Sequence, residues 1–483
     1  MEEGQVLTTV AAVLREQNDR YAPSPAREAH LRALGDGAPA VVTGQQTGLF
    51  LGPLFTLYKA ATAIRLARER SAVPLFWLQT EDHDLAEIAV TSLPRPQGGV
   101  LRLSAPAPTE PISVAHRRLP EAVDALRGEM AESLAGMTHG PAHLERLARH
   151  YRPGAGWGEA FAGMLAGLFA EEGLVLLDPR DPKLAPLAAP VHRRALSCWR
   201  EVADVLHAAG APETVHVRND SPLSFFHPEG PAGRRCRLRA RDGSGERFEE
   251  IGGSRTHALG SLLEVLEQEP LRFSTSALLR PILQDTWLPG AAYVGGPAEV
   301  RYFGQLGPLY DWFGLPRPEV LPRASFTVLE EGDRKRLARA CIPFQEVSRP
   351  VEEILEKACG TSVAGERVAA RLLEGFDRAL AEVHPTLRAS GERGERAAEK
   401  TRSTVARAVE KLAENVDAAW RLRDRSLVED VTRLRERLFP GGIPQERTYG
   451  PSYYLARYGE RAFLERVVDA AAPGDARPRS LEL

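Results

Sequence analysis

Two polar clusters in the first hundred residues carry side chains that could do chemistry. Residues 43–48 read TGQQTG and residues 81–84 read EDHD. Glycines let a backbone approach a ligand closely, and the free N–H groups at a helix start attract phosphate or carboxylate. A carboxylate beside a histidine can orient the imidazole ring and raise its pKa, which suits a general base or a group that orients an amine. Together the clusters indicate an anion site next to an acid–base group.

The elements around the two clusters are expected to bring them together. Ala38–Val42 and Val73–Leu78 are short apolar runs typical of strands buried on both faces. Between them, Gly52–Arg70 carries apolar residues at helical spacing. A right-handed strand–helix–strand crossover places the ends of both strands at one edge of the sheet, where ligands of open α/β sheets bind. We therefore expect both clusters to face one crevice.

Two polar residues of the intervening helix are candidates for the same crevice. Thr56 and Lys59 lie within two turns of the helix start, where a lysine could neutralise a phosphate or a carboxylate. A solvated helix face is the alternative for Lys59. The EDHD cluster could also bind a metal ion, but one histidine with adjacent acids does not specify a metal site, so no metal is predicted.

A later segment adds candidates at the same edge. Glu299 falls in the first turn of a helix that starts after Gly295-Gly296-Pro297, where helix capping is the alternative to binding an amine or a sugar hydroxyl. Arg280, Gln284 and Asp285 share one helical face, where salt bridging at the edge of the core competes with a ligand role.

The composition is that of a globular protein. The chain has 483 residues, 43% hydrophobic residues and a net charge of −3, which suits two or three domains and lacks the basic excess of a nucleic-acid binder. We attribute the abundance of Arg, Ala, Gly and Pro to a GC-rich genome rather than to an arginine-dependent function. The N-terminus lacks the features of a secretory signal and no apolar run reaches membrane-spanning length, so we expect a cytoplasmic protein that does not associate with membranes.

The four cysteines carry no site pattern. Cys198, Cys236, Cys341 and Cys359 are scattered and form no Cys-x-x-Cys pair, so neither a disulfide framework nor a thiolate zinc site is indicated. We expect these cysteines to be reduced.

Hydrophobic spacing divides the chain into three regions. Residues 1–348 are predicted to form an α/β core that is interrupted at about 92–156 and 219–270, the second interruption being a small β-containing insertion. Residues 439–483 return to a globular pattern and are expected to pack back on the core.

The region between these parts is predicted to be helical. Residues 349–438 are dense in Glu, Arg and Ala with one apolar stripe, which predicts a helical hairpin or coiled coil whose first arm is kinked or interrupted at Pro385. Polar helices with one apolar stripe usually pack on a partner, so a homodimer is expected, with packing inside one chain as the alternative.

Two shorter predictions concern the core. Ser274–Asp285 is predicted to be helical, and Thr214–Val217 is predicted to be a short strand.

Several motifs in chain order resemble the BshC family, the cysteine-adding enzymes of bacillithiol biosynthesis. The matching segments are residues 42–48, residues 52–59, Phe76-Trp77 with residues 81–84, residues 279–281 with Gln284-Asp285, residues 293–297 with Glu299, and Gln445-Glu446-Arg447. The resemblance extends over nearly the whole chain. It implies a Rossmann-like parallel-sheet core with connecting-peptide insertions, plus a C-terminal α-helical coiled coil used for dimerisation.

The resemblance also implies a reaction, the addition of cysteine to the amine of glucosaminyl-malate by an amide-forming ligase. A carboxylate is a poor electrophile and an ammonium has no free lone pair, so the acid must be activated and the amine deprotonated. In the adenylation interpretation ATP is a cosubstrate, its phosphates lie near residues 43–48, Thr56 and Lys59, and cysteinyl-AMP forms. His83, oriented by Asp82 or Asp84, would then position or deprotonate the amine.

The residues expected at the site follow from these arguments. They are His83, Asp82, Asp84 and Lys59 as catalytic groups, and Thr43, Gly44, Gln45, Gln46, Gly48, Thr56, Glu81, Arg280, Gln284, Asp285, Gly295, Gly296, Glu299 and Arg447 as binding groups for substrate or nucleotide.

Two other functions stay open at this stage. One is a nucleotidylyltransferase-like ligase that acts on another amino acid and amine, because the sequence identifies no side-chain pocket. The other is a non-catalytic scaffold whose coiled coil recruits pathway partners. The joint presence of Lys59 and the Glu81–Asp84 cluster argues against the scaffold.

Overall fold

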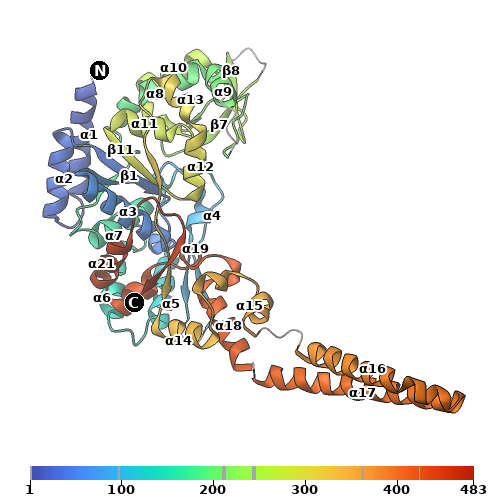
Figure 1. Cartoon of the computed structure of the whole chain (residues 1–483). Coiled ribbons are helices and arrows are strands. Elements are labelled where there is room, and N and C mark those ends of the chain that lie inside the picture. Colours follow the sequence, from blue (N-terminus) through green and yellow to red (C-terminus); the bar gives the residue numbers. More distant parts are fainter. Residues whose placement is uncertain (1–2, 96–97, 209–213, 242–245, 360–363, 424) are drawn as a thin grey trace. The chain divides into compact units, whose positions relative to one another are not determined.

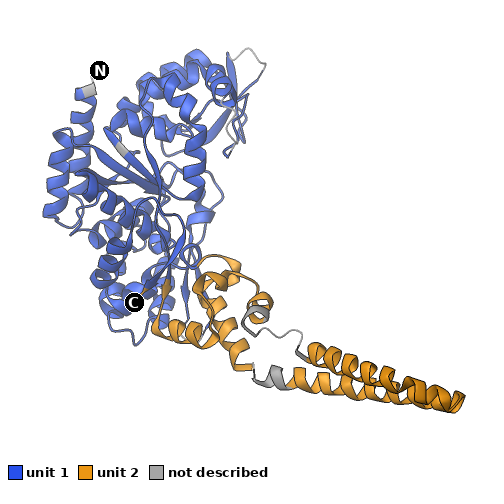
Figure 2. Cartoon of the chain, viewed as in Figure 1, with its two compact units in different colours: residues 1–327, 445–481 blue, residues 328–444, 482–483 orange. Residues whose placement is uncertain are grey.

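The computed structural model describes residues 3–95, 98–208, 214–241, 246–359, 364–423 and 425–483. The chain forms two compact units (Figure 2), the first made of residues 1–327 and 445–481 and the second of residues 328–444 and 482–483. The chain therefore leaves the first unit and later returns to it. All the candidate site residues belong to the first unit.

A parallel sheet of five strands is the centre of the first unit (Figure 1). Its strands, in spatial order, are β12 (Val320–Pro322), β11 (Gly290–Gly295), β1 (Ala40–Gln45), β2 (Val73–Leu78) and β5 (Val175–Leu177). In the central pairs, Val42 of β1 lies opposite Leu75 of β2 and Tyr293 of β11. Because these strands run in one direction, the carboxyl ends of β1, β2 and β11 meet at one edge, as the strand–helix–strand pattern predicted.

Alternate residues of β1 face two different apolar cores. Ala40 and Val42 pack with the helices of one face, whereas Val41 packs with Ala63 and Ala67 of α3 on the other. The helices that contribute to the first core are α1 (Glu3–Asn18), α2 (Pro25–Gly35), α8 (Ala185–Ser197), α9 (Trp199–Ala208), α11 (Arg280–Trp287), α12 (Pro297–Gln305) and α13 (Gly307–Phe313). The sheet is thus covered by helices on both faces, as in other α/β folds.

The connection from β1 to α3 (Phe55–Arg70) is unusually tight. It passes through the 3-10 turn η1 (Leu49–Leu51), in which Phe50 and Leu51 have φ angles of 48° and 73°. A Cβ added to Gly48 would lie 2.7 Å from the Cα of Gly52, so the two glycines allow the backbone to pass this closely. Gly48 is therefore required by chain packing.

The remaining elements of the first unit surround this centre. They are α4 (Leu85–Ile88), β3 (Val90–Pro94), β4 (Val100–Ser104), α5 (Ala122–Ser133), α6 (Gly140–His150), α7 (Trp157–Leu168), α19 (Gln445–Thr448), α20 (Ser452–Tyr458) and α21 (Glu460–Ala470). Two further strands are β13 (Ser325–Leu329) and β14 (Pro478–Glu482).

A second sheet forms a module within the first unit. It is antiparallel, and its strands in spatial order are β10 (Phe273–Thr275), β6 (Ser224–Phe226), β7 (Cys236–Ala240), β8 (Arg247–Glu250) and β9 (Thr256–Ala258), followed in the chain after β9 by α10 (Leu259–Gln268). Phe226, Leu238, Phe248 and Phe273 form its core with residues of α10. We call residues 214–279 the module below.

Two predictions of local structure in this region are wrong. Residues 273–275 form β10 because they pair with β6, so the helix predicted from Ser274 begins only at Arg280. Thr214–Val217 is irregular rather than a strand. In both places tertiary contacts decide the conformation of a short segment whose own pattern is ambiguous.

The second unit is helical. Its helices are α14 (Glu331–Ala340), α15 (Val351–Cys359), α16 (Ala364–Ala389), α17 (Glu392–Arg423) and α18 (Arg425–Leu438). α14 packs on α18 around Leu337, Val431 and Leu434, so residues 328–348 belong with the helices, whereas the sequence pattern assigned them to the core.

The long helices α16 and α17 pack against each other as a hairpin. α16 continues through Pro385 to Ala389, so of the two predicted outcomes, a kink or an interruption, the interruption is wrong. The proline still removes one backbone N–H donor from the last turns of the helix. Leu372, Val383 and Leu412 of this hairpin are exposed. In the described ranges, none of the helices is long and apolar enough to cross a membrane.

Candidate active site

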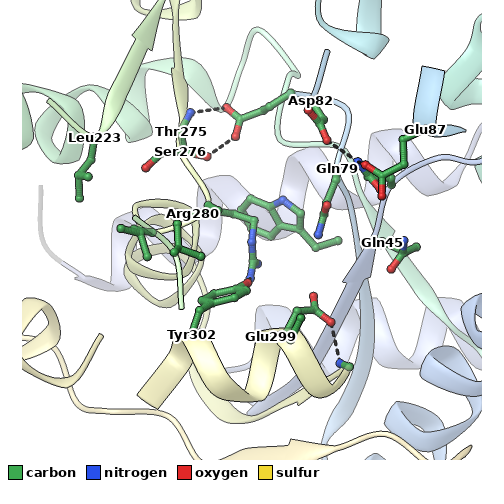
Figure 3. Close-up of a pocket in the computed structure, with 18 of the residues that line it drawn as sticks. Gln45, Gln79, Asp82, Glu87, Leu223, Thr275, Ser276, Arg280, Glu299 and Tyr302 are labelled. Atoms are coloured by element: carbon green, nitrogen blue, oxygen red, sulfur yellow. Dashed lines mark hydrogen bonds between the residues drawn. The ribbon is translucent and has the colours of Figure 1, made fainter. Parts of the chain in front are cut away.

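The carboxyl ends of β1, β2 and β11 open into a cavity of about 540 Å³. Figure 3 shows side chains that enter it from several directions: Gln45, Gln79, Asp82 and Glu87 on one side, Leu223, Thr275 and Ser276 across from them, and Glu299 and Tyr302 from α12. Among the described residues that line it, seven are basic and four are acidic: Lys59, Arg218, Arg235, Arg237, Arg280, Arg323 and Arg447 against Glu81, Asp82, Glu87 and Glu299. The cavity therefore has an excess of positive charge.

Lys59 is bound entirely by protein groups. Its Nζ atom forms an ion pair with Glu299 and donates hydrogen bonds to the carbonyl oxygen of Gly44 at 2.6 Å and to Oε1 of Gln45 at 3.0 Å. An ammonium group has three N–H donors, so these partners use all of them. Lys59 thus joins α3, the end of β1 and the start of α12, and its charge is balanced by a carboxylate.

The carboxylate of Glu299 is also bound by several protein groups. Besides Lys59, it accepts hydrogen bonds from the Tyr293 hydroxyl at 2.7 Å and from the backbone N–H of Gly296 at 2.7 Å, the second being a capping interaction of α12. Burial alone would raise the pKa of Glu299, but the charge of Lys59 and these hydrogen bonds outweigh it and hold the pKa below its ordinary value. Burial lowers the pKa of Lys59. We call Gln45, Lys59, Asp82 and Glu299 the strand-end side of the cavity.

Carboxylates gather where β2 ends. Gln46 donates from Nε2 to Asp82 at 2.6 Å and to Glu87 at 2.9 Å, which holds the two acids near each other. Burial alone would raise the pKa of Asp82, but the Gln46 hydrogen bond and the charge of Arg235 keep it below its ordinary value. Asp82 is therefore ionised near neutral pH and suits binding of a cation more than accepting a proton.

The third carboxylate at this end, Glu81, is tied to the module. It accepts hydrogen bonds from the backbone N–H of Thr275 at 3.2 Å and from the Thr275 hydroxyl. Glu81 lines the cavity, but both of its carboxylate oxygens already accept a hydrogen bond from Thr275.

His83 is oriented by an arginine rather than by the neighbouring aspartates. Nη1 of Arg235 lies 2.8 Å from Nδ1 of His83, whereas the nearest Asp82 oxygen is 3.9 Å from that nitrogen. A guanidinium can only donate, so Nδ1 accepts and the neutral ring carries its proton on Nε2. Burial, and next the charge of Arg235, lowers the pKa of His83, which keeps the ring neutral near pH 7. Asp84 instead caps α4 through the N–H of Glu87.

This arrangement makes His83 a hydrogen-bond donor through Nε2. The prediction that Asp82 or Asp84 orients the ring is wrong, because the buried guanidinium reaches Nδ1 from the module, a contact between residues 152 positions apart that local spacing does not reveal.

Arg235 is itself held in one position by the module. It donates from Nε to the Ser274 hydroxyl at 3.0 Å and from Nη2 to the Thr275 carbonyl at 2.7 Å, and its guanidinium carbon lies 3.8 Å from the centre of the Phe225 ring. Ser274 also contacts Nε2 of buried His227 at 3.1 Å. Burial lowers the pKa of His227 to about 2, so this histidine stays neutral and its Nε2 accepts a hydrogen bond from the Ser274 hydroxyl.

The predicted group on α11 is a packed network at one end of the cavity. Arg280 donates to Gln284 at 2.9 Å and to the Tyr302 hydroxyl at 3.2 Å, and Gln284 donates to Asp285 at 2.8 Å. Of the three predicted residues only Arg280 reaches the cavity. Burial raises the pKa of Asp285, whose other oxygen accepts from Tyr310.

The Gln445–Arg447 segment contributes two different residues. Glu446 accepts two hydrogen bonds from buried Arg323, at 2.9 and 2.7 Å. Arg447 is exposed, lines the cavity and lies 5.8 Å from the centre of the Phe55 ring.

The structure brings half of the predicted site residues to the cavity. Those that line it are Gln45, Gln46, Lys59, Glu81, Asp82, Arg280, Gly296, Glu299 and Arg447. Those that do not are Thr43, Gly44, Gly48, Thr56, His83, Asp84, Gln284, Asp285 and Gly295. Several of the second group have structural partners: Thr43 donates to the Val294 carbonyl across the sheet, and a Cβ on Gly44 would lie 2.8 Å from the Trp77 carbonyl oxygen.

The module contributes side chains to the cavity that the sequence pattern did not predict. Arg218, Phe225, Arg235 and Arg237, which we call the module side, all line the cavity. Their segment was interpreted as an insertion, and the abundance of arginine was attributed to genome composition. The run Arg234-Arg235-Cys236-Arg237 was the available signal. In the described part of the chain, no group of three or more His, Cys, Asp or Glu side chains is arranged to hold a metal ion.

Comparisons with known proteins give one consistent result. The family described as "Bacillithiol biosynthesis BshC, N-terminal Rossmann-like domain" matches residues 2–324, and the one described as "Bacillithiol biosynthesis BshC, C-terminal coiled-coil domain" matches residues 326–479. Among solved structures, a "putative arginyl t-RNA synthetase" from Campylobacter jejuni is 9% identical and covers 89% of this chain and 97% of its own, but its TM-score of 0.24 is too low to bear on fold or function.

Curated relatives named "Putative cysteine ligase BshC" are similar over most of their length, as three examples show. The protein from Koribacter versatilis is 35% identical, over 96% of this chain and 87% of its own. The one from Salinibacter ruber is 32% identical, over 93% and 84%. The one from Chlorobaculum tepidum is 31% identical, over 92% and 84%.

Proposed function

Because this chain belongs to the BshC family of bacillithiol biosynthesis, we propose that it joins cysteine to the amine of glucosaminyl-malate and so forms bacillithiol. The observation that carries the proposal is the match of both family domains, which together cover residues 2–324 and 326–479, with relatives named as cysteine ligases. The bond formed is an amide. The amine nitrogen attacks the carboxyl carbon of cysteine, the carbon–oxygen bond to the activated oxygen breaks, and the nitrogen loses a proton.

The acids at the end of β2 suit the amine of the sugar. Asp82 and Glu87 lie in the cavity near each other, and the lowered pKa of Asp82 keeps it charged. A pair of carboxylates attracts an ammonium group and fixes its direction. We propose that these acids bind the amine of glucosaminyl-malate before the amide forms.

His83 is proposed to act next to this position as a hydrogen-bond donor. Because Arg235 occupies Nδ1, the ring offers Nε2–H, which could hold a hydroxyl or a developing negative oxygen. To act as a general base, the ring would have to release Arg235 first. These contacts favour a role in orientation and charge stabilisation over proton abstraction.

ATP is proposed as the cosubstrate that supplies the energy and the leaving group for activation of the cysteine carboxylate. The residues first expected to bind its phosphates fit poorly, because Lys59 is paired with Glu299 and Gln46 with Asp82 and Glu87. Arg447 is a better candidate for a phosphate ligand, since it lines the cavity beside Phe55 near the start of α3.

We further propose that the α16–α17 hairpin joins two copies of the chain into a homodimer. Leu372, Val383 and Leu412 are exposed on these long helices, and a second copy of the hairpin would cover them. Replacing Leu372 by Arg should convert dimer to monomer in light scattering. A wild-type protein that is monomeric at micromolar concentration would contradict this assembly.

The reaction is tested with the purified chain, cysteine, glucosaminyl-malate and ATP, with the thiol product followed by mass spectrometry. The expected result is bacillithiol, together with loss of bacillithiol and accumulation of glucosaminyl-malate in a strain that lacks the gene. His83→Ala should fail to restore bacillithiol to that strain while the purified variant keeps its circular dichroism spectrum. Restoration by His83→Ala would remove the proposed role of His83.

Separate titrations with each substrate distinguish the other functions. A protein that binds ATP and an amine other than glucosaminyl-malate would be a ligase of different specificity. A protein that binds none of the three compounds would be a scaffold. Reactions without ATP, and with ATP followed for release of AMP or ADP, test the cosubstrate independently.

A further inference from the structure

Most of the basic side chains in the cavity form hydrogen bonds or ion pairs with the protein, but three form neither with any described residue. Lys59 is paired with Glu299, Arg323 with Glu446, Arg235 with His83 and Ser274, and Arg280 with Gln284 and Tyr302. Arg218, Arg237 and Arg447 donate no side-chain hydrogen bond and form no ion pair with any residue in the described ranges. These three side chains are the ones available to a ligand.

Arg237 is the most constrained of the three. It lies on β7 directly opposite Phe225 of β6, and its guanidinium carbon is 5.5 Å from the centre of that ring. The side chain is half-buried, and burial lowers its pKa. A guanidinium has five N–H donors, so leaving it partly buried without acceptors is unfavourable unless a ligand supplies them.

Arg218 lines the same cavity and adds a second positive charge to it. After burial, its charge is the largest cause of the lowered pKa of Arg237, and the opposing effect of Asp220 is smaller. Two guanidinium groups that repel each other in a cavity, with no carboxylate paired to either, form a site for an anion.

We propose that Arg218 and Arg237 form an anion subsite that binds the carboxylates at the malate end of the sugar substrate. This assignment rests on the proposed function for the identity of the ligand. The shared chemistry is a group with two or more anionic oxygens, which a nucleotide phosphate would also provide.

The position of the subsite favours the carboxylates. The ring of Phe225, which Arg237 faces across β6 and β7, lies 6.2 Å from the ring of His83, and His83 is the residue after Asp82. The subsite on the module side is therefore close to the acids proposed to bind the amine. In glucosaminyl-malate, the malate is attached to the sugar carbon next to the one that bears the amine. An amine bound by Asp82 and Glu87 therefore brings the malate towards nearby groups. Arg447 lies instead beside Phe55, which leaves that arginine for another anion.

The test compares two amine substrates in the full-length enzyme. Arg237→Gln should raise the KM for glucosaminyl-malate roughly tenfold to a hundredfold, since it removes charge-assisted hydrogen bonds from a half-buried site. Arg218→Gln should raise it less, about threefold to tenfold, because the side chain is exposed. For methyl glucosaminide, which has the amine but no carboxylate, neither variant should change the KM by more than about twofold. Arg237→Lys should restore part of the affinity.

Arg239 supplies a matched control. It lies on the same strand, is paired with Glu249 at 2.6 Å and does not line the cavity, so Arg239→Gln should leave both KM values unchanged. Thermal unfolding of each variant checks that the module still folds.

The KM values for the different substrates distinguish a failure of the subsite from a failure of the proposed function. If the variants raise the KM for ATP and leave that for glucosaminyl-malate unchanged, the subsite binds phosphate and the carboxylate assignment is overturned. If all KM values stay unchanged in an active enzyme, there is no anion subsite, while the proposed function stands. Calorimetry with L-malate alone needs no catalysis: binding by wild type and its loss in Arg237→Gln would support the subsite even if cysteine ligation is not observed.

Discussion

The two sides of the cavity use charge in opposite ways. On the strand-end side, Lys59 and Glu299 neutralise each other and join three elements of the parallel sheet region. On the module side, Arg235 is held by neutral acceptors and Arg237 by an aromatic face, so their positive charge is not cancelled. Charged residues that line one cavity are therefore not equivalent: some maintain the edge of the parallel sheet, and others remain available to a ligand.

The largest expected effect is a loss of stability caused by removing the buried ion pair on the strand-end side. Lys59→Met leaves Glu299 buried without its cation, which should lower the free energy of unfolding by about 3–5 kcal/mol in urea titrations. Because the folded-state pKa of Glu299 is below its ordinary value, the stability it contributes is present near neutral pH and is lost as pH falls through that folded-state pKa. This acid dependence should weaken in the variant.

The control for Lys59 is an exposed ion pair. Lys183 pairs with Glu16 at the surface, and Lys183→Met should cost less than about 1 kcal/mol. Equal losses for the two lysines would show that the buried pair has no special role in holding the edge.

The next largest effect comes from the hydrogen bond by which Arg235 of the module holds His83, next to Asp82. Arg235→Gln removes the donor to Nδ1 of His83, and we expect kcat to fall roughly tenfold to a hundredfold. Burial and then the charge of Arg235 lower the pKa of His83, so removal of the charge should raise that pKa. If the neutral ring is the active form, the acid limb of the kcat profile then moves to higher pH, and NMR titration of the ring should give the same shift. An unchanged pKa for His83 would mean that Arg235 does not act on the ring.

A smaller effect is expected from two buried histidines that contact serines of the module: His192 lies 2.8 Å from the Ser224 hydroxyl and His227 lies 3.1 Å from the Ser274 hydroxyl. Burial lowers the pKa of His192 to about 3 and that of His227 to about 2, whereas the ordinary value is 6.5. The unfolded chain binds more protons below pH 6.5, so stability is complete above that value and decreases as the solution is acidified. Between pH 6.5 and 5.5 each histidine should cost about 1 kcal/mol.

This acid sensitivity can be assigned by substitution. His192→Gln and His227→Gln should each flatten the decrease of the urea midpoint with pH, whereas His207→Gln, at an exposed position, should not. A slope that is the same in all three variants would contradict the assignment.

The smallest effect concerns Asp84. Its carboxylate caps α4 at 3.2 Å from the N–H of Glu87, so Asp84→Ala should lower the free energy of unfolding by about 1 kcal/mol. Asp84→Asn, which can still accept this hydrogen bond, should retain most of it. A large loss of stability in Asp84→Asn would show that the negative charge, and not the cap, is what matters at this position.

The sequence predicted the centre of the fold because its signals there are local. The apolar runs of β1 and β2 and the helix between them are continuous in the chain, and their order alone brings residues 43–48 and 81–84 to one edge. The family resemblance and the parallel sheet are confirmed. Glu299 was placed correctly at the start of α12, although capping and ligand binding were left as alternatives.

The residues that were missed depend on contacts far apart in the chain. His83 and Arg235 meet only because the antiparallel sheet folds over the ends of the strands, and nothing in the spacing of EDHD indicates an arginine partner. Arg237 is hidden for a different reason, since the run Arg234-Arg235-Cys236-Arg237 is a weak signal in an arginine-rich chain. Its significance lies in the absence of a partner among the described residues, which only coordinates reveal.

The return of the chain to the first unit also has a consequence for synthesis. Arg323 is buried, and its partner Glu446 is made more than a hundred residues later, after residues 328–444 of the second unit have been synthesised. Until then the nascent first unit contains a guanidinium without its counter-ion, so its last steps of folding must wait for the end of translation. A chain that ends before residue 445 would lack both the counter-ion of Arg323 and the Arg447 side chain that lines the cavity.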